Sequence, residues 1–292
     1  MKQQDAYKIL AAFLVITMLG SVFAYMFIGK NDNSNSETVI PDTNPEKYNP
    51  EFWTVNQPFN SISDALSMTP PGAIVTYFID LENMPPQMIQ WVSQEIPVIQ
   101  EVDSLYNSNT TKMYYASIKE DGNDSFLLLS AMSIPKNDFE YIVIPNTTIL
   151  ERTDAGKITG MINIMGTPVI YAPDKVAGDV LNIIYGLNES NTSYDTYKNL
   201  LTKVEPAPYQ ILNANVSFAK QFYIGLNLVN GSYERTTAYL DANSSVLKRI
   251  NQSKANSSEK GFEQYSINQS GNYTIVKIIS PELFKVLNEV SN

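Results

Sequence analysis

The longest apolar stretch of the chain runs from Ile9 to Ile28 and contains no charged residue. A helix needs about 20 predominantly apolar residues to cross a bilayer core of roughly 30 Å, so this stretch predicts a transmembrane anchor preceded by a cytoplasmic stub at 1–8. Two lysines and one aspartate precede the span, a bias that slightly favours a cytoplasmic N-terminus. A cleaved signal peptide ending at Ala24 stays open as an alternative, and both interpretations export the rest of the chain.

The composition changes abruptly after this span. Residues 29–60 are rich in proline and asparagine and show neither helical nor strand periodicity. Such a segment is typical of a spacer, here an extracytoplasmic tether that holds the remaining chain away from the membrane.

From residue 61 onward, hydrophobic periodicity predicts strands and helices in succession. Asp121-Gly122 and Asn230-Gly231 separate apolar runs and indicate hairpin turns. Strands are predicted over 72–81, 112–119, 125–134, 139–144, 158–164, 167–171, 209–218, 221–229, 233–240, 262–267 and 273–279. Helices are predicted over 85–105 with a kink at Pro97, and over 173–187, 193–204, 244–250 and 281–290. This order of elements predicts an α+β fold with antiparallel sheets covered by helices.

Two parts of the chain resemble each other. Segments 76–135 and 237–281 each contain a strand, a helix and a hairpin in that order, with the related stretches SIKEDGNDSFL and SINQSGNYTIV. Similar turn chemistry also produces such likeness by chance, so an internal duplication is a hypothesis here. We expect two α+β lobes, 61–190 and 191–292.

The overall composition excludes several classes of protein. Hydrophobic residues make up 43% and charged residues 17% of the chain, which suits a folded domain with a sizeable core. The net charge of −10 and the lack of basic runs argue against nucleic-acid binding. The chain has no cysteine and no histidine, which excludes disulfides, thiol nucleophiles, Ser-His-Asp triads and ordinary zinc sites.

The most distinctive pattern is an excess of N-glycosylation triplets, Asn-x-Ser/Thr with x other than proline. Twelve occur among 29 asparagines, whereas chance predicts roughly four or five. All lie downstream of the apolar span, at Asn109, Asn123, Asn146, Asn188, Asn191, Asn215, Asn230, Asn243, Asn251, Asn256, Asn268 and Asn272. Asparagine also gathers in turns for conformational reasons, which is an alternative for Asn123 and Asn272. The whole excess favours glycosylation at several sites.

Acidic residues give only weak indications of chemistry. Asp80 and Glu82 end an apolar strand two residues apart, a spacing that places two carboxylates on one side, as in glycosidases. Capping of the helix after Pro85 is the simpler explanation, and Asp241 occupies a similar place later in the chain. The run 120–124 faintly resembles a calcium loop, but a solvated hairpin turn explains it.

We therefore expect a single-pass membrane protein whose main domain is an extracytoplasmic glycoprotein with a structural or interaction role. Its composition resembles that of archaeal cell-surface glycoproteins, and no catalytic, cofactor or metal residue is assigned. Expected partners are the membrane, through the N-terminal helix, and other envelope or membrane proteins, but no nucleic acid. Two alternatives stay open: a ligand-binding module beside a transporter or membrane complex, and a carboxylate-dependent extracytoplasmic hydrolase.

Overall fold

The computed structural model describes residues 46–47, 55–120, 122–133, 139–144, 149–153, 161–187 and 191–289. The expected anchor, the cytoplasmic stub and most of the tether lie outside these residues. Within the described ranges, no helix combines the length and apolar character that a membrane crossing requires.

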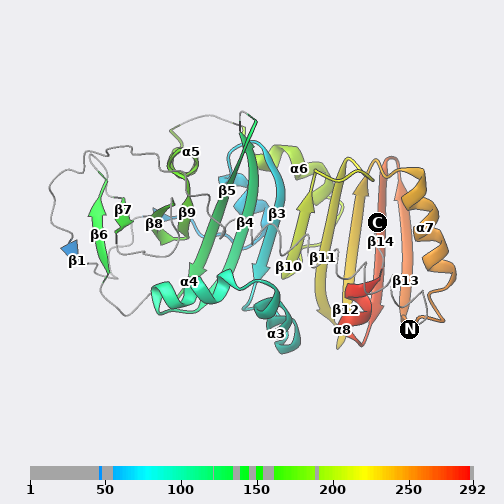
Figure 1. The fold of residues 1–292 in the computed structure, drawn as a ribbon. Helices are drawn as coiled ribbons and strands as arrows, with labels where there is room; N and C mark the ends of the chain where they lie inside the picture. The colour runs from blue at the N-terminus through cyan, green and yellow to red at the C-terminus, as the bar shows by residue number, and fades with distance from the viewer. Residues whose placement is uncertain are drawn as a thin grey trace.

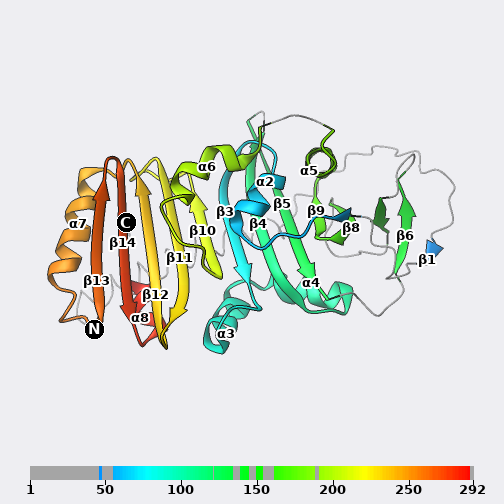
Figure 2. The same cartoon turned by 180° about the vertical axis from the view of Figure 1, so that it is seen from behind.

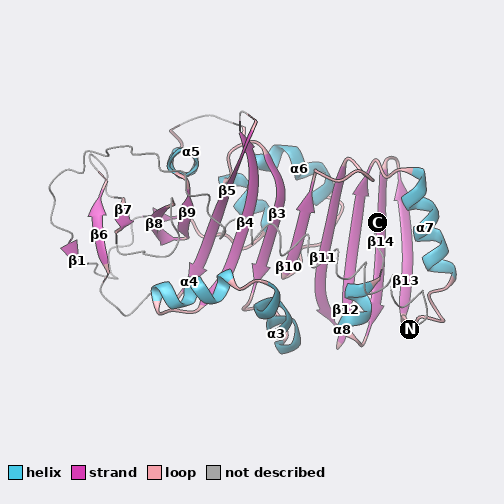
Figure 3. Cartoon of the chain, viewed as in Figure 1, coloured by secondary structure: helices cyan, strands magenta, loops and turns pink. Residues whose placement is uncertain are grey.

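Fourteen described strands form one sheet (Figures 1 and 3). Their order across the sheet is β1-β6-β7-β8-β9-β5-β4-β3-β10-β11-β12-β14-β13, and β2 joins beside β8. Neighbouring strands are antiparallel except β2 and β8, which are parallel. The strands are β1 (Glu46–Lys47), β2 (Val55–Asn56), β3 (Ala73–Asp80), β4 (Thr110–Glu120), β5 (Asn123–Met132), β6 (Glu140–Val143), β7 (Leu150–Arg152), β8 (Ile162–Thr167), β9 (Val169–Ala172), β10 (Tyr209–Asn213), β11 (Gln221–Val229), β12 (Ser232–Leu240), β13 (Gln264–Ser270) and β14 (Tyr273–Ser280).

Seven helices of the described chain pack on the two faces of the sheet, as the opposite views of Figures 1 and 2 show. One face carries α3 (Pro86–Glu95), α4 (Val98–Tyr106), α7 (Ser244–Ala255) and α8 (Leu283–Asn288). The other carries α2 (Ile62–Met68), α5 (Asp174–Ile184) and α6 (Ser193–Leu201). The central strands are therefore buried on both faces, which explains why β3 is apolar along most of its length.

Tyrosine supplies much of this double core. Tyr77, Tyr115 and Tyr239 pack with the first group of helices, whereas Tyr114 and Tyr223 pack with the second. Several phenol groups bond to neighbouring atoms; the hydroxyl of Tyr114, for example, lies 3.0 Å from Thr69 Oγ1. Buried hydroxyls need such partners, so these rings also fix the helices against the sheet.

The α+β class with a large antiparallel sheet is confirmed, and most predicted elements are present. The prediction of one kinked helix over 85–105 is corrected to two separate helices, because Pro97 cannot donate a backbone hydrogen bond. The predicted strand 209–218 ends at Asn213, and the helix predicted over 244–250 continues to Ala255.

The expected lobes 61–190 and 191–292 form the two halves of one sheet. Strands β3 and β10 join them through a hydrogen-bonded pairing from Val75–Asn213 to Ile79–Tyr209. The duplication hypothesis is contradicted by strand order. In the first segment the strand after the helices, β4, returns beside β3, whereas in the second β13 lies at the edge and β14 lies beside β12.

Helix α2 and strand β2 were not predicted from the sequence. Val55 of β2 lies opposite Gly166 of β8, so the end of the expected tether belongs to the sheet. A Cβ atom at Gly166 would lie 2.3 Å from Val55 Cβ, so only glycine permits this approach. Gly166 thus serves a close backbone contact with Val55.

Candidate functional site

The glycosylation triplets have a consistent location on the structure. Ten of the twelve asparagines fall in the described chain, and the side chains of all ten are exposed; Asn146 and Asn188 lie outside it. Ten other asparagines are described, and four of these, Asn163, Asn182, Asn213 and Asn227, are buried or half-buried. All ten described triplet asparagines are thus exposed, as are six of the ten others.

Backbone conformation explains only a few of the ten positions. Asn230 has a φ of 52° and precedes Gly231 with a φ of 85°, a turn that favours asparagine without any modification. Asn243 is the N-cap of α7, where its side chain accepts a hydrogen bond from the Val246 amide at 3.0 Å. Neither Asn123 nor Asn272 has a positive φ, so a left-handed backbone does not explain why asparagine occurs at these two hairpins.

The ten side-chain amides differ in availability. Asn243 uses its Oδ1 as the cap, which leaves the Nδ2 atom that a glycan would modify outside that bond. Asn251 lies within α7, and its Nδ2 donates to the Leu247 carbonyl at 2.9 Å. Asn251 is therefore the less accessible acceptor of these two.

The predicted carboxylate pair is divided between separate partners. Asp80 is buried and accepts hydrogen bonds from the backbone and side-chain nitrogens of Asn83, at 3.3 and 2.8 Å. Glu82 bonds Lys112 Nζ at 2.6 Å. The expected helix cap is also corrected, because Pro85 is the N-cap of α3 and makes no side-chain bond. Asp80 instead stabilises the turn that leads to α3.

Asp241 and the run 120–124 are the two further acidic positions singled out in the sequence. Asp241 has a φ of 53° and precedes α7 without capping it, since Asn243 does so. The run 120–124 forms the β4–β5 turn, of which Asp121 lies outside the described residues. No group of three or more candidate metal ligands occurs among the described side chains.

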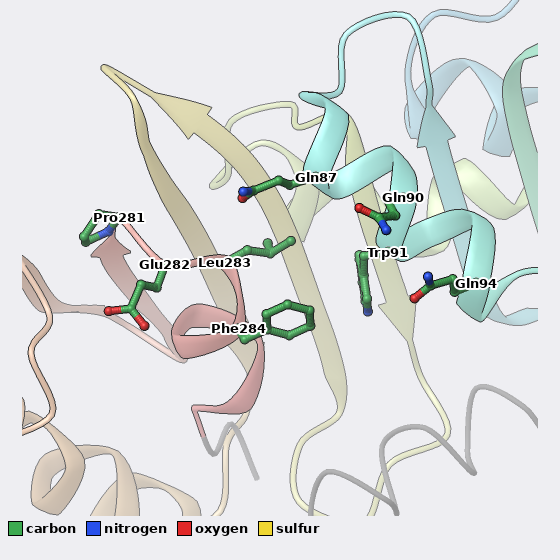
Figure 4. A pocket seen from close by; sticks show the side chains of 8 residues that line it. All are labelled: Gln87, Gln90, Trp91, Gln94, Pro281, Glu282, Leu283 and Phe284. Atoms are coloured by element: carbon green, nitrogen blue, oxygen red, sulfur yellow. The ribbon is translucent and has the colours of Figure 1, made fainter.

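A groove between α3 and the start of α8 was not predicted. It has a volume of about 420 Å³ and is lined by Gln87, Gln90, Trp91, Gln94, Pro281, Glu282, Leu283 and Phe284. The four α3 residues recur at intervals of three and four, which places them on one helix face. Figure 4 shows them opposite the α8 segment, with the Phe284 ring directed towards α3.

Packing beneath the groove fixes two of its side chains. Trp91 lies against the buried Tyr209 ring with centroids 5.1 Å apart, in an edge-to-face arrangement. Gln87 Oε1 accepts a hydrogen bond from the Tyr233 hydroxyl at 2.6 Å, which leaves its Nε2 group as a donor. These contacts hold one aromatic ring and one amide in place at the groove.

The groove is nearly neutral. Of the described residues that line it, Glu282 alone is charged, and its carboxylate bonds Lys285 Nζ at 2.7 Å. Phe284 is 63% exposed although it is one of the largest apolar side chains on the surface. The sequence does hold a signal for this groove, since Gln87, Gln90 and Gln94 recur at helical spacing around Trp91. The buried residues Met88 and Val92 of the same helix indicated only that α3 packs on a core.

Comparisons with known proteins add little. No family model and no curated protein matches the chain. Solved structures of TP0453 are similar at 12% identity: crystal form III has a TM-score of 0.47 and covers 81% of this chain and 99% of that chain. Crystal form I, with a TM-score of 0.44, covers 80% and 97%, and crystal form IV, also with 0.44, covers 77% and 96%. Scores below 0.5 at this identity transfer neither a function nor a detailed architecture.

Proposed function

We propose that this chain is a membrane-anchored, N-glycosylated cell-surface protein with a structural or interaction role. The observation that carries the proposal is the exposure of all ten described triplet asparagines, against six of the ten other described asparagines. Glycans need a surface position, and a left-handed backbone accounts for Asn230 alone among the ten described triplet asparagines.

The expected anchor and tether precede the strand at one end of the sheet. The first described strand, β1, pairs with β6 at one end of the sheet, and β13 forms the other end. Neighbouring strands lie about 4.8 Å apart, so the twelve steps from β1 to β13 span roughly 55–60 Å. The transmembrane helix at 9–28 and the tether that we expect before β1 would then place β1 and β6 nearest the membrane.

Half of the ten described triplets lie at the β13 end of the sheet. Asn251 lies on α7, Asn243 and Asn256 flank that helix, Asn268 lies on β13, and Asn272 lies in the β13–β14 turn. The other five are distributed along the rest of the described chain, at Asn109, Asn123, Asn191, Asn215 and Asn230, and Asn146, between β6 and β7 in sequence, lies outside the described residues. Sugars at the β13 end would then face away from the bilayer.

Glycopeptide mass spectrometry on the full-length protein from its native membranes tests the proposal. We expect sugars on several triplet asparagines, with lower occupancy at Asn251 than at Asn272, because the Asn251 amide already bonds within a helix. Detection of Met1–Lys8 peptides in the mature protein would support a retained anchor. Unmodified asparagines at every triplet would overturn the glycoprotein assignment.

Energy transfer to the bilayer tests the orientation. The chain has no cysteine, so Val143→Cys on β6 and Lys254→Cys on α7 each provide a single labelling site at an exposed position. With acceptor dyes in the lipid headgroups, the label at position 143 should transfer more efficiently than the label at position 254. Equal or reversed efficiencies would contradict the arrangement.

A further inference from the structure

An exposed apolar side chain, Leu228, lies close to the β11–β12 turn. Leu228 pairs with Tyr233 across β11 and β12, so the two side chains lie on the same face of the sheet. The buried Tyr233 in turn contacts Gln87 of the groove and pairs with Ser280, which precedes the groove segment of α8. Leu228 is 38% exposed and Phe284 is 63% exposed, and we refer to these two side chains as the apolar strip.

A glycosylation triplet adjoins this strip. Asn230-Gly231-Ser232 forms the β11–β12 turn and ends one residue before Tyr233. Three residues of extended chain cover about 10 Å, so the Asn230 backbone lies within roughly that distance of Tyr233. Figures 1 and 2 both show α8 at the end of the strands where β11 turns into β12.

The lining of the groove suits a neutral sugar chain. Pyranose rings present C–H faces, which pack on aromatic rings such as Trp91 and Phe284, and hydroxyl groups around their edges. A primary amide both donates and accepts hydrogen bonds, and Gln90 and Gln94 place two exposed amides beside the indole. The sole carboxylate, Glu282, would repel an acidic sugar, whereas no cation of the lining would attract one.

We propose that the N-linked glycan of Asn230 folds back over its own chain and occupies the α3–α8 groove, where neutral sugar rings cover Phe284 and Trp91. The proposal rests on the proposed function in one respect, since it requires Asn230 to be glycosylated. The exposed apolar strip would then be covered by a glycan of the same molecule.

Trp91 fluorescence tests the proposal. The chain has two tryptophans, so Trp53→Phe leaves Trp91 as the sole reporter in the full-length protein from native membranes. Ser232→Ala removes the Asn230 triplet and keeps asparagine in its left-handed turn position. Loss of the cover should raise acrylamide quenching of Trp91 by about twofold, because the indole face returns to water.

Ser217→Ala is the matched control, because it removes the Asn215 triplet in the loop at the opposite end of β11. It should leave quenching unchanged. Mass spectrometry separates the possible failures. Three results would overturn this proposal alone: unchanged quenching in Ser232→Ala when Asn230 is occupied in the parent protein, an equal rise in both variants, or an unoccupied Asn230 beside other occupied sites. Absence of sugar at every site would overturn the proposed function and this proposal together.

Discussion

Alkaline pH should unfold this domain cooperatively, because nine of its tyrosines are almost completely buried. They are Tyr77, Tyr106, Tyr114, Tyr115, Tyr171, Tyr197, Tyr209, Tyr223 and Tyr239, each at most 5% exposed. Burial raises the pKa of every one of these phenols well above the ordinary value of about 10. Below pH 10 these phenols are protonated in both the folded and the unfolded chain, and their contribution to stability is fully present. Above pH 10 the phenols of the unfolded chain lose their protons while the buried ones do not, so the unfolded state is favoured increasingly and that contribution is lost.

The magnitude decides the outcome. At pH 11 an unfolded tyrosine gains about 1.4 kcal/mol by ionising, and nine such groups at about 1.4 kcal/mol each give about 13 kcal/mol. A domain is ordinarily stable by about 5–15 kcal/mol, so the fold should be lost between about pH 10 and 11. The signal should be a coincident change in far-UV circular dichroism and in tyrosinate absorbance at 295 nm.

Paired variants isolate the phenol from other alkaline effects. Tyr209→Phe removes one buried group and should gain about 0.8 kcal/mol of unfolding free energy in urea at pH 10.5, relative to its effect at pH 7. Tyr185→Phe, which removes a phenol that is 44% exposed, serves as the surface control. A native circular dichroism spectrum that persists to pH 12 would refute the reasoning, whether or not the tyrosines ionise.

Two further substitutions test contacts at opposite ends of the sheet. Gly166→Ala should lower the free energy of unfolding, measured by urea titration, by about 1–3 kcal/mol, because the new methyl group would overlap Val55 and force β2 away from β8. Gly178→Ala is the control, since Gly178 faces open space on α5, and it should be neutral or slightly stabilising in the same titration. Arg235→Ala should lower the free energy of unfolding by about 3 kcal/mol, because the buried Arg235 Nη1 donates to the Glu289 carbonyl at 2.8 Å and so holds the end of α8. A loss below about 0.5 kcal/mol would show that this bond contributes little.

Local patterns predicted most elements because their signals are local. The Asn230-Gly231 and Asp121-Gly122 dipeptides set hairpins whose flanking strands occur within a few residues of the predicted bounds. Short elements such as α2 and β2 carry too few residues for a periodic pattern, and tertiary pairing alone defines them.

The pairing of distant segments could not be predicted in the same way. The contact between β3 and β10 joins residues 130 to 138 positions apart, and nothing in either strand encodes its partner. The groove has the same origin, because Trp91 and Phe284 become neighbours only after α3 and α8 pack on one face of the sheet. Sequence proximity misled in the case of the two carboxylates. Asp80 and Glu82 are close in sequence, but the turn gives each a different partner, so they do not act as a pair.

The two ends of this sheet face different risks of association with other strands. An exposed edge strand offers unpaired backbone groups to another chain, and proteins limit this with short strands, charges or covering elements. At one end β1 is only two residues long. At the other end β13 has seven residues, and its exposed positions, including Gln264 and Asn268, are polar but uncharged. Polar amides alone block strand pairing weakly, since they stack readily in extended chains.

Helix α7 lies beside this edge in both views of the molecule, and sugars on Asn256 and Asn268 would add bulk that no incoming strand accommodates (Figures 1 and 2). If the proposed sugars are present at Asn256 and Asn268, they would shield the longer of the two described edge strands.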